Sequence, residues 1–93
     1  MREAGFIAWM NGQGDRYNPA TTVQTYVAGL RAIERRYGKD LDKEWSRDDL
    51  VGIMSSVEAE RKGHATGDVR YRELSGDISK LRAYGEFCSA GSG

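Results

Sequence analysis

Apolar residues recur every three or four positions along most of the 93-residue chain, and this spacing restricts the fold more than any other feature. Between residues 19 and 37 these residues are Val23, Tyr26, Val27, Leu30, Ile33 and Tyr37. Such spacing puts them on one side of an α-helix, whereas a half-buried strand would show them at alternate positions. No segment alternates convincingly, so the sequence predicts an all-α fold.

The strongest helix prediction covers residues 19–37. Asn18 is a typical N-cap residue, Pro19 suits the first helical position, and Gly38 suits the stop. Near the N-terminus, Phe6 and the apolar residues around it predict a short helix over residues 2–10, ended by Gly12 and Gly14.

Two further helices are predicted in the second half of the chain. Ser46 has the carboxylate of Asp49 three residues later, which is close to a capping box and predicts a helix from Arg47 to Lys62. Residues 63–68 have the composition of a loop, and the apolar positions beyond them predict a last helix that ends near Cys88.

These helices are expected to form one compact four-helix bundle over residues 1–88, because a chain of this length has room for a single small core. The predicted core residues are Trp9, Val27, Leu30, Ile33, Leu50, Met54, Leu74, Ile78, Leu81 and Phe87. The small residues of positions 89–93 predict a flexible tail, or a linker to a further domain.

Charge and cysteine content limit the partners and the cellular compartment. Lys and Arg total 14, as do Asp and Glu, so no net charge attracts nucleic acid or an anionic membrane, and any such contact needs a local patch. The single cysteine excludes an intrachain disulfide, and no apolar run is long enough to span a bilayer. A soluble cytoplasmic protein without a membrane partner is predicted.

Catalytic and metal-binding chemistry find little support in the sequence. His64 is the only histidine and lies in the predicted loop, while Cys88 closes an apolar helical stripe, where a buried structural cysteine is common. The carboxylate pairs lie in hydrophilic stretches with no apolar wall to raise a pKa. We therefore expect no enzymatic activity, no cofactor and no metal site.

Two groups of basic residues are the candidate binding sites. Arg31, Arg35 and Lys39 follow one another at about one-turn spacing off the apolar stripe. Arg72, Lys80 and Arg82 lie on the last helix beside small residues that would let a phosphate backbone come close. The alternative is a solvated face with local ion pairs, because acidic residues interleave with these cations: Glu34, Glu73 and Asp77.

Several segments resemble one known domain family. Phe6 to Met10 resemble its "F..WL" opening segment, and Thr21-Thr22 open a helix with Tyr26 and Leu30 further in. Asp48-Asp49-Leu50 resemble its "DI/DL" start of the third helix, and Leu74 to Phe87 resemble its closing helix of the "LSALRKYYEFL" type. In this order they resemble the core-binding, SAM-like N-terminal domain of tyrosine recombinases, the phage integrases.

The resemblance implies a non-catalytic module that packs across double-stranded DNA as half of a clamp, with catalysis in a separate C-terminal domain. The six basic residues would contact phosphates, and three to five contacts would give weak, salt-dependent binding by the chain alone. A different hypothesis is a helical protein–protein interaction or self-association module. Its candidate contact residues are the aromatic residues Tyr17, Trp45 and Tyr84, since aromatic side chains concentrate at interface hot spots.

Overall fold

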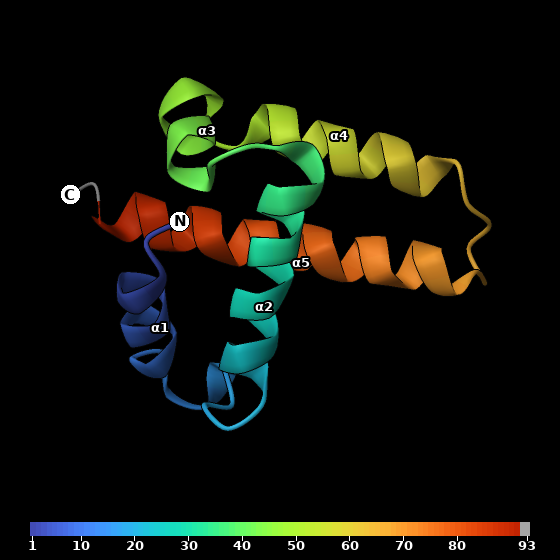
Figure 1. Ribbon diagram of the computed structural model, residues 1–93. Coiled ribbons are helices and arrows are strands. Elements are labelled where there is room, and N and C mark those ends of the chain that lie inside the picture. Colours follow the sequence, from blue (N-terminus) through green and yellow to red (C-terminus); the bar gives the residue numbers. More distant parts are fainter. Residues whose placement is uncertain (92–93) are drawn as a thin grey trace.

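The computed structural model describes residues 1–91, and these are all-helical, without a strand (Figure 1). The elements are α1 (Glu3–Asn11), the 3-10 helix η1 (Gly14–Arg16), α2 (Thr22–Tyr37), α3 (Leu41–Asp48), α4 (Val51–Lys62) and α5 (Val69–Gly91). The predicted all-α class is confirmed, although residues 1–91 form five α-helices where four were expected. The last two residues of the predicted tail, 92 and 93, lie outside the described residues.

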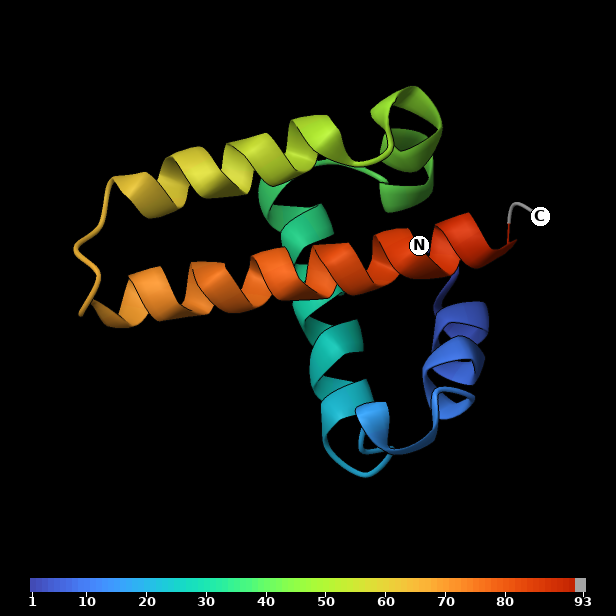
Figure 2. The same cartoon turned by 180° about the vertical axis from the view of Figure 1, so that it is seen from behind.

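The helices form two pairs that meet at a steep angle. α4 and α5 run side by side, joined by the loop at one end of the molecule, while α1 and α2 extend away from α5 (Figures 1 and 2). α2 crosses α5 near its middle, and α3 precedes α4 at the end away from that loop. The helix α5 therefore contacts its own partner α4 and also both helices of the other pair, α1 and α2, which makes it the central element of the bundle.

The core follows the predicted apolar positions closely but adds a group of aromatic and long side chains. Seven predicted residues are buried: Val27, Leu30, Ile33, Leu50, Leu74, Ile78 and Leu81. Trp9, Met54 and Phe87 are only partly buried and pack against the outside of this core. Phe6, Met10 and Leu41 are fully enclosed, although the prediction omitted them.

Aromatic contacts connect α1 to α5. The rings of Phe6 and Tyr84 meet edge to face with centroids 5.1 Å apart, and Tyr84 lies 5.5 Å from Phe87. Tyr17 is 5% exposed and Tyr84 is fully buried, while Trp45 is partly buried against the core. The prediction that Tyr17 and Tyr84 are available for a partner is therefore wrong, because the bundle uses both rings for its own packing.

The helix α3 was missed, and the predicted start of the following helix was wrong. Asp40 is the N-cap of α3, because its Oδ1 accepts hydrogen bonds from the backbone N–H groups of Asp42 (2.8 Å) and Lys43 (3.2 Å). Arg47, expected to open a helix after Ser46, instead lies in the last turn of α3.

A left-handed break separates α3 from α4. Asp49 and Leu50 have φ angles of 57° and 70°, so the chain reverses there and α4 begins at Val51. Such φ angles are costly for a bulky residue such as leucine. Burial of the Leu50 side chain holds this conformation in place, and the apolar spacing continues across the break, so periodicity alone did not show it.

The other boundaries differ by a few residues. Asn18 caps a turn rather than the helix, since its Oδ1 accepts from the N–H of Ala20 at 2.9 Å and α2 starts only at Thr22. The predicted stop at Gly38 is confirmed, and its φ of 61° explains why glycine is suited to this position. α5 continues as a helix through Gly91, where a flexible tail was expected from residue 89.

Replacing Leu30 tests the core. Leu30 is fully buried on α2, so Leu30→Ala should lower the free energy of unfolding by about 2–5 kcal/mol through lost apolar burial and a residual cavity. Urea denaturation followed by circular dichroism measures this change. The control Val51→Ala removes methyl groups from a side chain that is 61% exposed and should change stability by no more than about 0.5 kcal/mol.

Replacing Asp40 tests the unpredicted helix. Asp40→Ala removes the acceptor for two backbone N–H groups and should cost about 0.5–2 kcal/mol. Asp40→Asn keeps an acceptor oxygen and should lose much less, as judged by urea denaturation. Equal losses in the two variants would show that the cap does not hold α3 in place.

Candidate nucleic-acid interface

Three of the six predicted basic residues lie together on one side of α2. Arg31 and Arg35 are one helical turn apart, and Lys39 follows after the left-handed turn at Gly38. All three border an open hollow of about 470 Å³, whose remaining lining includes Met1, Glu34 and Asp40. We call the surface formed by Arg31, Arg35 and Lys39 the α2 rim.

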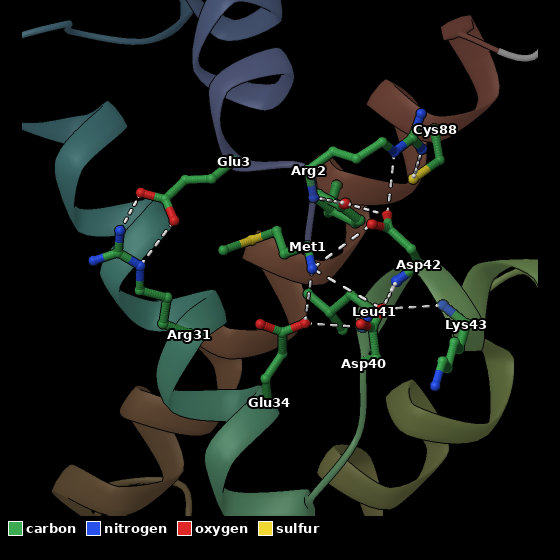
Figure 3. Close-up of polar contacts among 11 residues, drawn as sticks. Met1, Arg2, Glu3, Arg31, Glu34, Asp40, Leu41, Asp42, Lys43 and Cys88 are labelled. Carbon is green, nitrogen blue, oxygen red and sulfur yellow. Dashed lines mark hydrogen bonds and ion pairs between the residues drawn. The ribbon is translucent and has the colours of Figure 1, made fainter.

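Met1, Glu34 and Asp40, which also line this hollow, belong to a network of opposite charges that extends to Asp42 (Figure 3). The Met1 amino group lies 3.2 Å from Glu34 Oε2 and 3.6 Å from Asp42 Oδ2, and Glu34 Oε2 also accepts from the N–H of Leu41 at 3.0 Å. Burial alone would lower the pKa of the amino group, but the hydrogen bond that it donates to Glu34 and the charges of the surrounding carboxylates raise it. The Met1 amino group and, at Asp42, the Arg2 guanidinium thus offset part of the negative charge of these carboxylates.

The three cations of the α2 rim differ in how they are paired. Both nitrogens of the Arg31 fork bond to Glu3, with Nε 2.9 Å from Oε2 (Figure 3). Arg35 and Lys39 are exposed, and within residues 1–91 no carboxylate oxygen lies within 4 Å of either charged group. The rim therefore offers two uncompensated positive charges beside one another.

The remaining predicted cations are placed elsewhere. Lys80 lies at the crossing of α2 and α5, where its stem fills the space beside Gly29: a Cβ at that glycine would come within 2.5 Å of Lys80 Cδ. Arg82 borders a separate hollow with Tyr26, and Arg72 is exposed on the half of α5 nearer the loop.

The α2 rim and the three basic residues of α5 do not form one continuous surface. Tyr26, beside Lys80 and Arg82, lies nine residues before Arg35 on α2. That separation is about two and a half helical turns, so the two residues face opposite sides of α2. The structure brings together the three residues of the α2 rim and leaves the three α5 residues apart from it.

The interleaved acidic residues pair with other groups. Asp77 lies 3.3 Å from Arg36, Glu73 lies 3.0 Å from Arg70, and Glu34 is occupied by Met1 and Leu41. Within the described chain, the predicted pairing of these acids with the six candidate cations is not seen. Sequence spacing could not show this, because Arg36–Asp77 joins two helices that are far apart in sequence.

The other candidate groups of the sequence are engaged in structural contacts. Cys88 is buried, which raises the pKa of its thiol, and Arg2 Nη2 donates to its sulfur at 3.3 Å. His64 Nδ1 is 3.5 Å from Asp68 Oδ2. Residues 1–91 contain no cluster of three His, Cys, Asp or Glu side chains that could hold a metal ion. Over the same residues, no helix has the length and apolarity needed to cross a membrane.

Known proteins do not identify this chain. Comparison with protein families, with curated proteins and with solved structures found no match. The resemblance to integrase core-binding domains gains no support from these comparisons, so any functional argument depends on the site itself.

Asp42 supplies the best-defined electrostatic contact near the hollow. Its Oδ1 accepts a hydrogen bond of 2.5 Å from the Tyr84 hydroxyl and one of 3.2 Å from Arg2 Nε. Burial alone would raise the pKa of Asp42, but these hydrogen bonds and the positive charges of Met1 and Arg2 lower it. The ionised carboxylate is therefore favoured in the folded state.

This pKa shift predicts how Asp42 affects stability at different pH values. A carboxyl group with a lowered pKa contributes stability above its unfolded pKa of about 3.9 and loses it as the pH falls through the folded value. Wild type should exceed Asp42→Asn in stability at pH 7, and the difference should shrink below about pH 4. Urea denaturation across this pH range measures the difference, and a pH-independent gap would contradict the assignment.

Proposed function

We propose that this chain is a non-catalytic double-stranded DNA-binding module that uses the α2 rim to contact the phosphate backbone. The observation that carries this proposal is the pair of exposed cations, Arg35 and Lys39, on one rim without a carboxylate partner among residues 1–91. Arg31 lies on the same rim and would exchange Glu3 for a phosphate. Guanidinium and ammonium groups are the usual partners of phosphate oxygens.

The charge distribution favours weak, sequence-independent binding. The chain has no net charge, so long-range attraction to DNA is small and local contacts supply the affinity. Two or three phosphate contacts from the α2 rim would give a slope of log affinity against log salt of about −2 to −3. Phosphate contacts carry no sequence information directly, which is why no preferred DNA sequence is expected.

A module of this kind would act beside a separate catalytic domain, as the resemblance to integrase core-binding domains implies. The basic residues on α5, Arg72, Lys80 and Arg82, would contribute less, because they lie away from the α2 rim. Lys80 in particular already fills the helix crossing at Gly29.

The alternative, a protein-interaction or self-association module, has lost much of its support. Tyr17 and Tyr84 are buried within the bundle. The large apolar side chains exposed on the described chain are Val51 and Val69, which begin α4 and α5. These helices run antiparallel, so the two valines lie at opposite ends of the pair and form no common patch (Figure 1).

Neutral substitutions on the α2 rim test the DNA proposal. The double variant Arg35→Gln with Lys39→Gln removes two phosphate contacts, so the salt-dependence slope should become smaller by about 1.8. Fluorescence anisotropy of a labelled duplex, titrated at several salt concentrations, measures this slope. Both side chains are exposed, so the fold should persist, which circular dichroism checks.

A matched control removes the same charge elsewhere. The double variant Lys62→Gln with Arg72→Gln changes two exposed cations at the loop end of the α4–α5 pair. Neither residue borders the hollow of the α2 rim, so the slope should change much less than in the rim variant. Equal effects in both variants would show that binding follows overall charge rather than the α2 rim. Absence of duplex binding by wild type at low salt would reject the function itself.

A further inference from the structure

A second hollow, of about 190 Å³, lies where the end of α2, the helix α3 and the start of α4 meet. Its lining combines an acid, two bases, an aromatic ring and an apolar side chain: Glu44, Lys39, Arg47, Tyr37 and Ile53. Ligand pockets for drug-sized compounds are larger, at about 300–1,000 Å³. The size therefore suits a small metabolite. We call this hollow the Glu44 pocket.

Glu44 is the unusual residue of this pocket. It is a charged side chain that is only 7% exposed, because it shares the buried face of α3 with Leu41. Within residues 1–91, no hydrogen bond reaches its carboxylate, and its nearest cation is Arg47, with Nη1 3.8 Å from Oε2. Its carboxylate oxygens are not sealed from solvent, because among the described residues the side-chain atom that is fully buried without a partner is Asp48 Oδ1. The Glu44 carboxylate therefore lines the pocket without a hydrogen bond from the protein.

The edge and the wall of the Glu44 pocket supply groups that complement the Glu44 carboxylate. The Arg47 side chain is 70% exposed and Lys39 is exposed, so both long side chains are free to reorient over the opening. On the wall, Ile53 is buried, and the Tyr37 ring is fixed by its hydroxyl, which donates to Glu60 Oε2 at 2.7 Å. A ligand would thus meet a fixed acid and apolar wall below two mobile cations.

From this arrangement we propose that the Glu44 pocket binds a small zwitterion of the α-amino acid class. The ligand ammonium donates to the Glu44 carboxylate, and the ligand carboxylate accepts from Arg47 and Lys39. The remainder of the ligand packs against Tyr37 and Ile53, where the aromatic ring also favours a nearby ammonium.

Ligands with a single charge fit less well. A simple cation would pair with Glu44 but be repelled by Lys39 and Arg47. A simple anion would pair with these two cations but be repelled by the Glu44 carboxylate. A zwitterion pairs with both signs at once. It gives the Glu44 carboxylate charge-assisted hydrogen bonds, which no protein group provides within residues 1–91.

The proposal is independent of DNA binding, although Lys39 borders both hollows. Its tests therefore use Glu44 and Arg47, which do not line the hollow of the α2 rim. Loss of duplex binding in the rim variants and loss of amino acid binding in the pocket variants are separate results.

Nuclear magnetic resonance of the ¹⁵N-labelled chain tests the pocket directly. Titration with each common L-α-amino acid at millimolar concentration should give saturable amide shifts for at least one of them, centred on α3 and the start of α4. Its carboxamide and N-acetyl derivatives each lose one charged group and should bind about tenfold more weakly or worse. No saturable shift with any amino acid, or shifts centred elsewhere, would overturn the proposal.

Two variants and a control assign the contacts. Glu44→Gln should abolish amino acid binding, whereas Glu58→Gln, which neutralises a carboxylate outside the pocket, should leave it unchanged. Arg47→Gln should lower the affinity for the amino acid about tenfold but leave the affinity for its carboxamide unaltered. A merely structural role of Arg47 would lower both affinities. Unchanged binding by Glu44→Gln would exclude the proposed ammonium contact.

Discussion

Tyr84 connects three segments of this molecule through its ring and its hydroxyl. Its ring is fully buried on α5 between Phe6 of α1 and Phe87. Its hydroxyl accepts from the N–H of Arg2 and donates to Asp42 at the start of α3. Burial and the neighbouring Asp42 carboxylate raise the pKa of Tyr84, so the neutral hydroxyl that donates this bond is retained. One residue thus fixes the N-terminal segment, α3 and α5 relative to one another.

Charge compensation around this centre explains the surface that remains. Arg2 and Asp42 pair beside Tyr84, and Arg36 joins α2 to Asp77 on α5. Because these internal pairs use the interleaved acids, Arg35 and Lys39 are left without a carboxylate partner among residues 1–91, even though the chain is neutral overall. Net charge therefore gives little information about where unpaired cations gather on the surface of this chain.

The short helix α3 has the largest consequences for the two proposed sites. Its N-cap, Asp40, borders the hollow of the α2 rim, and its buried face carries Glu44 into the second pocket. Lys39, between α2 and α3, borders both hollows. The turn from Gly38 to Asp40 thus places the α2 rim and the Glu44 pocket next to each other.

The sequence by itself determined the helical class, the burial of seven core residues and the end of α2 at Gly38, because these depend on local spacing and on the backbone freedom of glycine. It also predicted the cations of the α2 rim, since Arg31 and Arg35 are neighbours on one helix. Only the tertiary structure decided that Leu50 takes a left-handed conformation, that Tyr84 is internal and that Glu44 is buried. Each of these outcomes depends on contacts between different helices, and the periodicity of a single helix carries no information about which of its neighbours will cover it.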